Sequence, residues 1–354
     1  MSRAAVIAMS PKSLLAQLFT PQMLADLREA VDVDTDLVIT SLEDEGAGGG
    51  DGAGGDVGSD AGGEGGGDAA RAARTALADA ELLIAGWGAP RIGVADAPNL
   101  RGVVYLGGVA ATCLDDPAAW AARGLVASNA RAANAVPVAE FALAMILLAG
   151  KDAPFAEQRY RDVRRMPDRA VELTDVGNYR KVVGIVGLSQ IAQVLIELLR
   201  PFDLDVVVYS PSLTPDRAAE LGVRMGTLAE VVSTADVVSL HQAVTPATVG
   251  QIDAALLASM RDGATLLNTA RGEVVDQDAL VRELRSGRIR AILDVTTPEP
   301  LPHDHPLWST PNTVLTPHLA GSMGTELYRM GASALDEVRR FVDGRPFAHR
   351  EDLA

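Results

Sequence analysis

Three residues with complementary chemistry lie in the second half of the chain: Arg271, Glu299 and His318. A histidine side chain titrates near neutral pH, so it is the natural candidate for a general acid or base. A neighbouring carboxylate stabilises the protonated ring and fixes its orientation. An arginine can hold a carboxylate group through two parallel hydrogen bonds. These residue types together predict a site that binds a small carboxylic acid and transfers a proton.

The three residues lie in polar segments that directly follow hydrophobic, β-branched runs. The segments are LHQAVTPAT (240–248), NTARGEVVDQDAL (268–280), LDVTTPEPLP (293–302) and LTPHLAGS (315–322). Each run predicts a strand, and each segment therefore begins at the carboxyl end of a strand. Ligands of parallel α/β sheets bind at that edge, so we expect the arginine, the acid and the histidine to meet there.

A glycine-containing turn precedes these segments, in VVGIVGLSQIAQVLIELL (182–199). A predicted strand runs into Gly187, and a predicted helix follows. In the dinucleotide-binding fingerprint G-x-G-x-x-G the first glycine is present, alanine is accepted at the third position, and Ser189 occupies the second. The serine could crowd a pyrophosphate through its Cβ or donate a hydrogen bond to it. Taken alone, the motif fits a plain strand–helix turn as well as a cofactor site.

Strands and helices alternate along most of the chain, which predicts an α/β protein with parallel sheets covered on both faces. We place a Rossmann-type doubly wound domain at residues 129–318. Residues 1–128 predict a smaller, flavodoxin-like α/β domain. The segment SMGTELYRMGASALDEVRRFVDG (322–344) predicts one long helix, and we expect residues 319–354 to pack on the smaller domain.

Residues 46–67 read GAGGGDGAGGDVGSDAGGEGGG, a composition that buries too little apolar area to offset the entropy of ordering. We interpret this segment as a disordered, tolerated insertion in a surface loop, with a functional tail as the alternative.

The net charge and the cysteine content limit which partners and which cellular compartment we expect. The net charge of −16 argues against nucleic acid and acidic membranes, which attract basic surfaces. The single cysteine, Cys113, excludes an internal disulfide and fits a reducing cytoplasm. The N-terminal segment has too short an apolar run for a signal peptide, and the apolar stretch VAEFALAMILLAG (138–150) is expected to be too short to span a bilayer.

The segments NTARGEVVDQDAL and LTPHLAGS together resemble the D-isomer-specific 2-hydroxyacid dehydrogenase family, which includes phosphoglycerate dehydrogenase and glyoxylate/hydroxypyruvate reductase. Upstream, APNLRGVVYLGG and NAVPVAEFALAMILLAG are also similar to that family. The pairing of GIVGLSQIA with DVTTPEPLP resembles a branch common in high-GC actinobacteria, where serine recurs at the second glycine position. The resemblance covers nearly the whole chain outside residues 46–67.

The resemblance implies an oxidoreductase that interconverts a small 2-oxo acid and its D-2-hydroxy acid with NAD, or with NADP. Arg271 would bind the substrate carboxylate and carbonyl, His318 would act as acid and base, and Glu299 would pair with it. The enzyme would be a cytoplasmic homodimer with no nucleic acid or membrane partner. The alternative is a dinucleotide-sensing, non-catalytic scaffold like the corepressors of this fold family.

The expected cofactor-binding residues are Gly187, Ser189, Gln190, Ile191, Ser210, His241, Thr269, Ala270, Asp294, His318, Ala320 and Gly321. The expected substrate-binding residues, besides Arg271, are Trp87, Gly88, Gly108 and Val109. The family usually carries an acid after this last loop, whereas the chain has Ala110 there.

Two further histidines, His303 and His305, form the sequence HDH in a predicted surface loop. They lack further nearby ligands, so we predict no metal site there.

Overall fold

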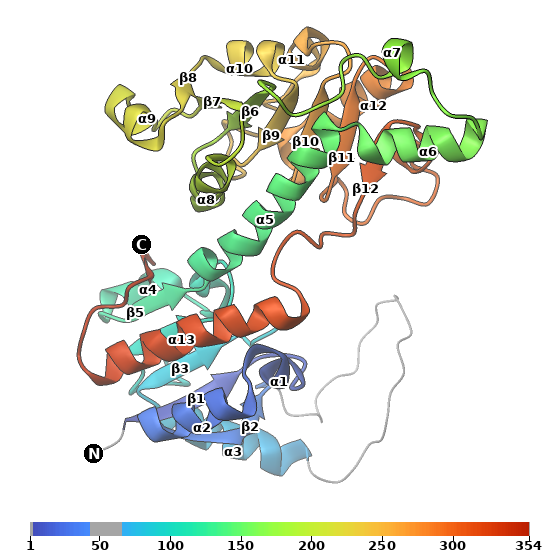
Figure 1. Ribbon diagram of the computed structural model, residues 1–354. Coiled ribbons are helices and arrows are strands. Elements are labelled where there is room, and N and C mark those ends of the chain that lie inside the picture. The colour runs from blue at the N-terminus through green and yellow to red at the C-terminus, as the bar shows by residue number, and fades with distance from the viewer. Residues whose placement is uncertain (1–2, 43–65, 354) are drawn as a thin grey trace. The chain divides into compact units, whose positions relative to one another are not determined.

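The computed structural model describes residues 3–42 and 66–353, which form two compact units (Figure 1). Unit 1 is Met1–Asn134 with Met323–Ala354, and unit 2 is Ala135–Ser322. The boundaries expected from the sequence, 129 and 318, fall six and four residues before these. The interpretation of residues 46–67 as disordered lies outside the described residues, except that helix α3 already begins at Gly66.

Unit 1 is built on a sheet of five parallel strands in the order β5-β4-β3-β1-β2, with a short antiparallel strand, β13, added beside β5. This is the flavodoxin-like order that the sequence predicts. The strands are β1 (Ala4–Ala8), β2 (Asp32–Ile39), β3 (Leu82–Ala85), β4 (Gly102–Tyr105), β5 (Val126–Asn129) and β13 (Arg350–Glu351). The two-residue β13 was not predicted.

Helices cover both faces of this sheet because side chains alternate between its faces. In β3, Leu82 and Ile84 pack with α1 (Leu14–Leu18), α2 (Pro21–Ala30) and α13 (Leu327–Val342). Leu83 and Ala85 pack on the opposite face with α3 (Gly66–Asp79) and α4 (Pro117–Ala122). The long C-terminal helix therefore packs on unit 1 as expected, although it starts at Leu327 after the short 3-10 turn η4 (Gly324–Glu326).

The only cysteine of the chain lies on this second face. Cys113 closes the 3-10 turn η1 (Ala110–Cys113), and its thiol donates a hydrogen bond of 3.1 Å to the carbonyl oxygen of Ala110. Burial raises the pKa of the Cys113 thiol to about 12.

Unit 2 contains a sheet of seven parallel strands in the order β12-β11-β10-β9-β6-β7-β8. The strand order reverses between β6 and β9, which defines a Rossmann-type doubly wound sheet and its topological switch point. The strands are β6 (Val182–Val186), β7 (Asp205–Tyr209), β8 (Arg224–Met225), β9 (Val237–Leu240), β10 (Thr265–Asn268), β11 (Arg290–Leu293) and β12 (Thr313–Leu315).

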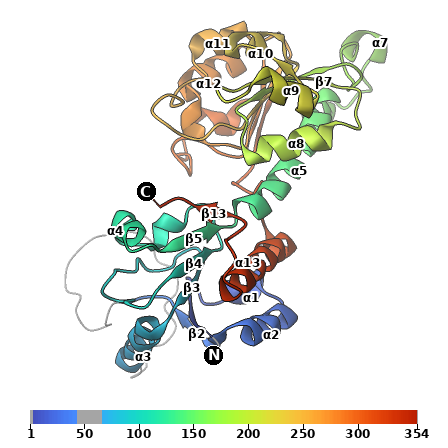
Figure 2. The ribbon, with the colours of Figure 1, turned by 90° about the vertical axis from the view of Figure 1, so that its left-hand side faces the viewer.

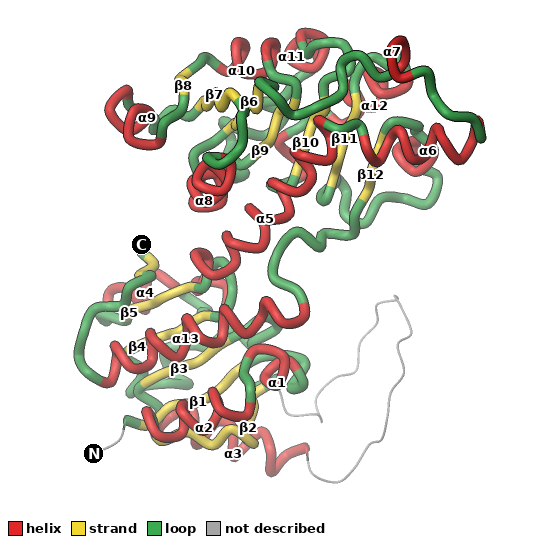
Figure 3. Tube along the Cα trace, viewed as in Figure 1, coloured by secondary structure: helices red, strands yellow, loops and turns green. Residues whose placement is uncertain are grey.

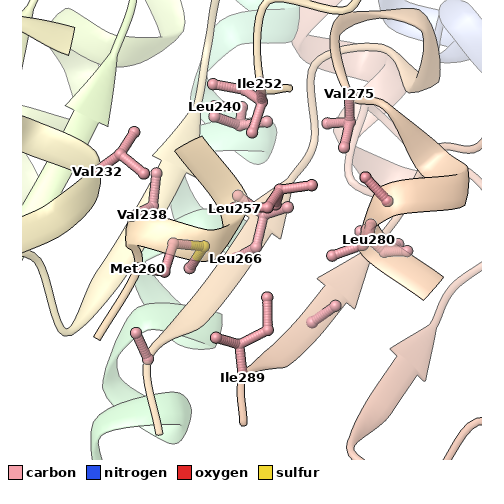
Figure 4. Close-up of a cluster of buried hydrophobic side chains, with 14 of the residues drawn as sticks. Val232, Val238, Leu240, Ile252, Leu257, Met260, Leu266, Val275, Leu280 and Ile289 are labelled. Carbon is pink, nitrogen blue, oxygen red and sulfur yellow. The ribbon is translucent and has the colours of Figure 1, made fainter. Parts of the chain in front are cut away.

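Helices lie on both faces of this sheet (Figure 3). A hydrophobic cluster fills the space between strands and helices on each face. One face packs against α10 (Leu228–Thr234), α11 (Ala254–Ser259) and α12 (Gln277–Arg285). Figure 4 shows this cluster around Leu257 and Leu266. The other face packs against α5 (Arg131–Gly150), α6 (Ala153–Val163), α8 (Gln190–Leu199) and α9 (Pro215–Leu221). The remaining short helices are α7 (Arg169–Glu172), η2 (Gly272–Val274) and η3 (Pro306–Ser309).

Local signals set several of these helix boundaries. A capping box of Thr227 and Glu230 opens α10, and both of its hydrogen bonds form. Helix α11 starts at Ala254 because Asp253 caps it, with its side chain accepting the Leu256 N–H.

The expectation that the apolar stretch 138–150 is too short to span a bilayer was wrong. Helix α5 runs for 20 residues from Arg131, through Pro137, to Gly150, and by length and composition it could cross a membrane. Such a helix alone is a weak indication, since the core helix of a soluble protein passes the same test. Ala142, Ile146 and Ala149 of α5 pack with the helices on one face of the unit 2 sheet.

Candidate active site

The segments predicted to carry the chemistry begin side by side at one edge of the unit 2 sheet. Leu240, Asn268, Leu293 and Leu315 are partners in the register of neighbouring strands β9, β10, β11 and β12. Because the strands are parallel, the segments that follow them leave the sheet at the same edge (Figure 1). Arg271, Glu299 and His318 thus emerge from adjacent strands.

His318 and Glu299 form a hydrogen-bonded pair at this edge. Nδ1 of the ring lies 2.7 Å from Oε1 of Glu299, and both side chains remain almost half exposed. Within the described residues the other ring nitrogen, Nε2, makes no hydrogen bond, so it can reach a ligand. His318 has φ +51°, a left-handed backbone conformation that a non-glycine residue adopts only where its surroundings impose it.

Asp294 imposes that conformation on the histidine loop. It is buried, and its carboxylate accepts hydrogen bonds from Thr316 Oγ1 (2.6 Å), from the Leu319 N–H (2.9 Å) and from the Ala320 N–H (3.0 Å). Its backbone carbonyl accepts the His318 N–H at 3.0 Å. Both carboxylate oxygens are thus occupied by the loop, which leaves Glu299 as the acid beside the ring.

Asn268, which the sequence-based site omitted, shapes the turn that carries Arg271. Its buried side chain accepts a hydrogen bond from the Ala270 N–H (3.0 Å) and donates one to the Arg271 carbonyl (2.8 Å). The Arg271 guanidinium donates to the Ala270 carbonyl at 2.7 Å, and the residue is exposed. The turn therefore presents the guanidinium at the surface of the sheet edge.

Close packing holds the Arg271 turn against the segment that leads to Glu299. A Cβ atom placed on Gly272 would lie 2.1 Å from the carbonyl carbon of Thr296. Gln277, also omitted from the sequence-based site, accepts a hydrogen bond from the Thr297 N–H at 3.0 Å and donates one to the Thr297 carbonyl. Both omitted residues lie in the quoted segment NTARGEVVDQDAL, but only their partners reveal their role.

The glycine turn fits a phosphate at the start of α8. Gly187 has φ +95°, and a Cβ atom there would lie 2.7 Å from the backbone nitrogen of Gln242, so only glycine fits. Ser189 is the N-cap of α8, and its hydroxyl accepts the Ala192 N–H at 3.3 Å. In the described residues no hydrogen bond uses the N–H groups of Gln190 and Ile191. Two backbone donors thus remain at the positive end of the helix.

Buried polar atoms without partners gather at the same edge. Among the described residues, Thr269 Oγ1, His241 Nδ1 and Gln242 Oε1 are buried and make no hydrogen bond. They follow β9 and β10, next to the switch point. Buried polar groups in native proteins are normally satisfied, so these atoms point to a bound polar ligand. Three further residues predicted to bind the cofactor also lie at this edge. Ala270 follows Thr269 in the chain, the Ala320 N–H donates a hydrogen bond to Asp294, and Gly321 follows Ala320.

No carboxylate follows β7, where NAD enzymes hold the ribose. The Ser210 hydroxyl lies 3.0 Å from that of Ser212. The nearest arginine along the chain, Arg217, donates to Gln193 at 2.9 Å and to Glu220 at 2.8 Å.

His241 is buried, and its Nε2 lies 2.8 Å from the Ser239 hydroxyl. Burial lowers the pKa of His241 from 6.5 to about 4, so the ring is neutral in the folded protein at neutral pH.

This burial predicts a pH-dependent stability. Between pH 6.5 and about 4 the unfolded chain protonates His241 while the folded chain does not, so stability present above pH 6.5 is lost as the pH falls. The full effect is about 3 kcal/mol. Urea unfolding at pH 7.5 and pH 4.5 should show a smaller loss for His241→Asn than for the wild type. The exposed His303→Asn is the control, and an equal loss in all three proteins contradicts the prediction.

The predicted substrate loops lie side by side in unit 1. Trp87 and Gly88 follow β3, and Gly107, Gly108 and Val109 follow β4. The Trp87 ring nitrogen approaches Gly107, since a Cβ atom there would lie 3.2 Å from it. Gly88 has φ +67°, while Gly108 and Val109 are exposed, with open space around Gly108.

Metal ligands do not gather among the described residues, where no group of three or more His, Cys, Asp and Glu side chains could hold an ion. The two nitrogens of His305 contact the Leu307 N–H (3.2 Å) and the Gln277 amide (3.3 Å).

A doubly wound sheet with a glycine turn at its switch point and an acid–base pair at its carboxyl edge is typical of nicotinamide-dependent oxidoreductases. Residues 143–320 match the family model of the D-isomer specific 2-hydroxyacid dehydrogenase NAD binding domain. The chain belongs to this family, and unit 2 is its NAD-binding domain.

Curated relatives and solved structures agree with this assignment. The chain is 36% identical over 254 residues to D-3-phosphoglycerate dehydrogenase of Mycobacterium tuberculosis, covering 71% of this chain and 47% of that protein. It is 34% identical over 226 residues to the Bacillus subtilis D-3-phosphoglycerate dehydrogenase, covering 63% and 42%. The chain thus spans about half the length of the curated relatives it matches. A phosphoglycerate oxidoreductase from Rhizobium etli has the same fold, with a TM-score of 0.76, 24% identity and coverage of 99% and 98%.

Proposed function

We propose that the protein is an NAD(P)-dependent 2-hydroxyacid dehydrogenase, which interconverts a small 2-oxo acid and its D-2-hydroxy acid. The observation that carries the proposal is the 2.7 Å pair of His318 and Glu299 at the carboxyl edge of the NAD-binding domain, beside the strand that leads to Arg271. The pair supplies a proton donor and acceptor, and the arginine supplies a carboxylate anchor.

The nicotinamide, when bound, supplies or accepts the hydride at C2 of the substrate. The residues of the chain do the rest. Arg271 holds the substrate carboxylate and carbonyl. His318, oriented through Nδ1 by Glu299, gives a proton to the substrate oxygen in reduction and takes it back in oxidation. The loop N–H groups near Trp87–Gly88 and Gly108–Val109 are further donors for the substrate carboxylate.

The residues present fit a dinucleotide. The N–H groups of Gln190 and Ile191 would hold the pyrophosphate, while the partnerless atoms of Thr269, His241 and Gln242 would hydrogen-bond near the nicotinamide. We place Ser189, Ser210, Ala270, Asp294, His318, Ala320 and Gly321 in the same binding region.

Cofactor choice should be weak, with a modest preference for NAD(H). Ser210 offers a hydroxyl without the charge that repels a 2′-phosphate, and Arg217 is already engaged by Glu220. Ser210→Asp should therefore lower kcat/KM with NADPH by about tenfold or more and leave NADH within about threefold. Ser212→Asn, which adds no charge, is the control. A preference of the wild type for NADPH above about a hundredfold contradicts the assignment.

We also propose a cytoplasmic homodimer. Five large apolar side chains in residues 160–179, from the last turn of α6 to the segment before β6, are more than half exposed: Tyr160, Val163, Met166, Val171 and Tyr179. Exposed apolar side chains gathered in one segment are typical of protein interfaces. Light scattering should give twice the chain mass of 37.0 kDa. A mass of 37.0 kDa at micromolar concentration contradicts the dimer.

Turnover tests the function directly. The protein is incubated with NADH or NADPH and a panel of 2-oxo acids that includes glyoxylate and hydroxypyruvate, and oxidation of the cofactor is followed by its absorbance. Turnover of at least one 2-oxo acid is the expected result. Tight NADH binding without turnover of any of them would instead favour a dinucleotide-sensing scaffold.

A further inference from the structure

A carboxylate from the C-terminal tail holds the loop after β4. Glu351 lies in β13, which pairs with β5 in an antiparallel manner, with Glu351 opposite Ala127 (Figure 2). Its side chain is only 7% exposed. Oε2 accepts the Ala110 N–H at 3.1 Å and the Asn129 amide at 2.6 Å, while Oε1 accepts the Ala111 N–H at 3.5 Å.

The loop cannot supply this carboxylate itself. Val109 is the N-cap of η1 and has no polar side chain, and Ala110 and Ala111 follow it. The N–H groups at the start of the turn would therefore lack a partner if Glu351 did not reach them across 241 sequence positions. An unpaired buried donor is costly, so the carboxylate is a strong constraint on the loop.

Arg131 holds the same loop from its other side. Its Nε donates a hydrogen bond to the Gly108 carbonyl, and its Nη2 lies 4.0 Å from Glu351 Oε2. The two charged side chains thus hydrogen-bond the backbone on either side of Val109, at the Gly108 carbonyl and at the Ala110 N–H. Gly108 and Val109 themselves stay exposed.

The tail that carries Glu351 is fixed in turn. Glu337 of α13 is buried and accepts the N–H groups of Ala348 (3.0 Å) and His349 (2.7 Å). The Asn129 N–H donates to the His349 carbonyl at 3.1 Å. The backbone segment that carries Glu351 is therefore held in place by hydrogen bonds to Glu337 and Asn129.

We propose that Glu351 is a positioning residue for substrate binding: with Arg131 it orients the Gly108–Val109 backbone that receives the substrate carboxylate. The inference rests on the proposed dehydrogenase function. Glu351 touches neither substrate nor cofactor, and it acts through the peptide groups of the loop.

The first arm of the test measures the loop without using activity. Hydrogen exchange in Glu351→Gln should be faster than in the wild type at Ala110 and Ala111, and unchanged in β1 and β3. Asp343→Asn, which removes an exposed acid of the same C-terminal region, is the matched control. Unchanged exchange at Ala110 and Ala111, or faster exchange throughout unit 1, overturns the proposal.

The second arm separates binding from chemistry. Glu351→Gln should raise KM for the 2-oxo acid about tenfold, since the two charge-assisted hydrogen bonds from Glu351 to the loop N–H groups are weakened, and leave kcat and the KM for NADH within about threefold. Arg131→Met should have a similar effect, and the double variant should fall short of the product of the two effects, because both act on one loop. A proportional fall in kcat, or additive effects, overturns the proposal.

The two arms also distinguish this inference from the proposed function. A wild-type protein that turns over no 2-oxo acid refutes the function, and with it the substrate role of Glu351. Normal wild-type turnover with an unaltered KM in Glu351→Gln refutes the inference alone.

Discussion

Replacing His318 by glutamine should lower kcat/KM by about 10²–10⁴-fold in both the reductive and the oxidative direction. Glutamine keeps a similar size and can hydrogen-bond Glu299, but it cannot give or take a proton. Asp294 and His241, two other titratable side chains described at this edge, are buried and already hydrogen-bonded within the chain. NADH binding, measured by fluorescence, should stay within a few-fold. If the variant retains more than a tenth of the activity, His318 is not the residue that transfers the proton.

Glu299→Gln tests the partner of the histidine. Reduction needs a protonated ring and oxidation a neutral one, and the carboxylate 2.7 Å away favours the protonated ring. Without that charge, the pH above which reductive kcat/KM declines should move down. Oxidative activity should persist to correspondingly lower pH. Unmoved profiles would mean that the pair does not control the proton.

Replacing Gly272 by alanine should lower kcat/KM by about a hundredfold or more. The new Cβ would lie 2.1 Å from the Thr296 carbonyl carbon and 2.2 Å from its oxygen, and neither backbone atom can yield without moving its segment. The Arg271 turn and the segment leading to Glu299 must then separate. Misplacing a substrate-binding group by about 1 Å can cost a hundredfold in rate. Unfolding stability should also fall, by about 1–3 kcal/mol.

Gly287→Ala is the matched control for this variant. Gly287 has φ +75° and open space around it, so alanine adds backbone strain of about 1 kcal/mol without moving the Arg271 turn. Both variants should be destabilised, but only Gly272→Ala should lose most of its activity at a temperature where both are folded. Equal activity in the two variants would show that the close approach at Gly272 is not needed.

The sequence predicted the layout of the site because strand periodicity and chain direction are local properties. Runs such as Thr265–Asn268 and Arg290–Leu293 identify buried strands, and parallel packing brings their carboxyl ends to one edge. The pairing of His318 with Glu299 followed from that edge and from the resemblance to a family. The register of β10, β11 and β12 then fixed which segments are neighbours.

Contacts between segments that lie far apart in the chain could not be predicted from the sequence. The pattern did not show that both oxygens of Asp294 hold the histidine loop, because any acid after a strand looks like a ligand contact. Glu351 was missed since a two-residue strand has no periodicity and its partners lie more than 200 positions away. Pro137 obscured the length of α5, because proline usually ends a helix, whereas here the helix continues through it.

The burial of Cys113 has a practical consequence. A thiol with a pKa of about 12 forms almost no thiolate at neutral pH, so it should resist oxidants and maleimides while the protein is folded. As the chain has no other cysteine, thiol reagents should leave the folded native protein almost unlabelled. A single cysteine introduced at the exposed Thr112, beside the loop that Glu351 holds, could then carry a fluorophore that reports loop motion in real time.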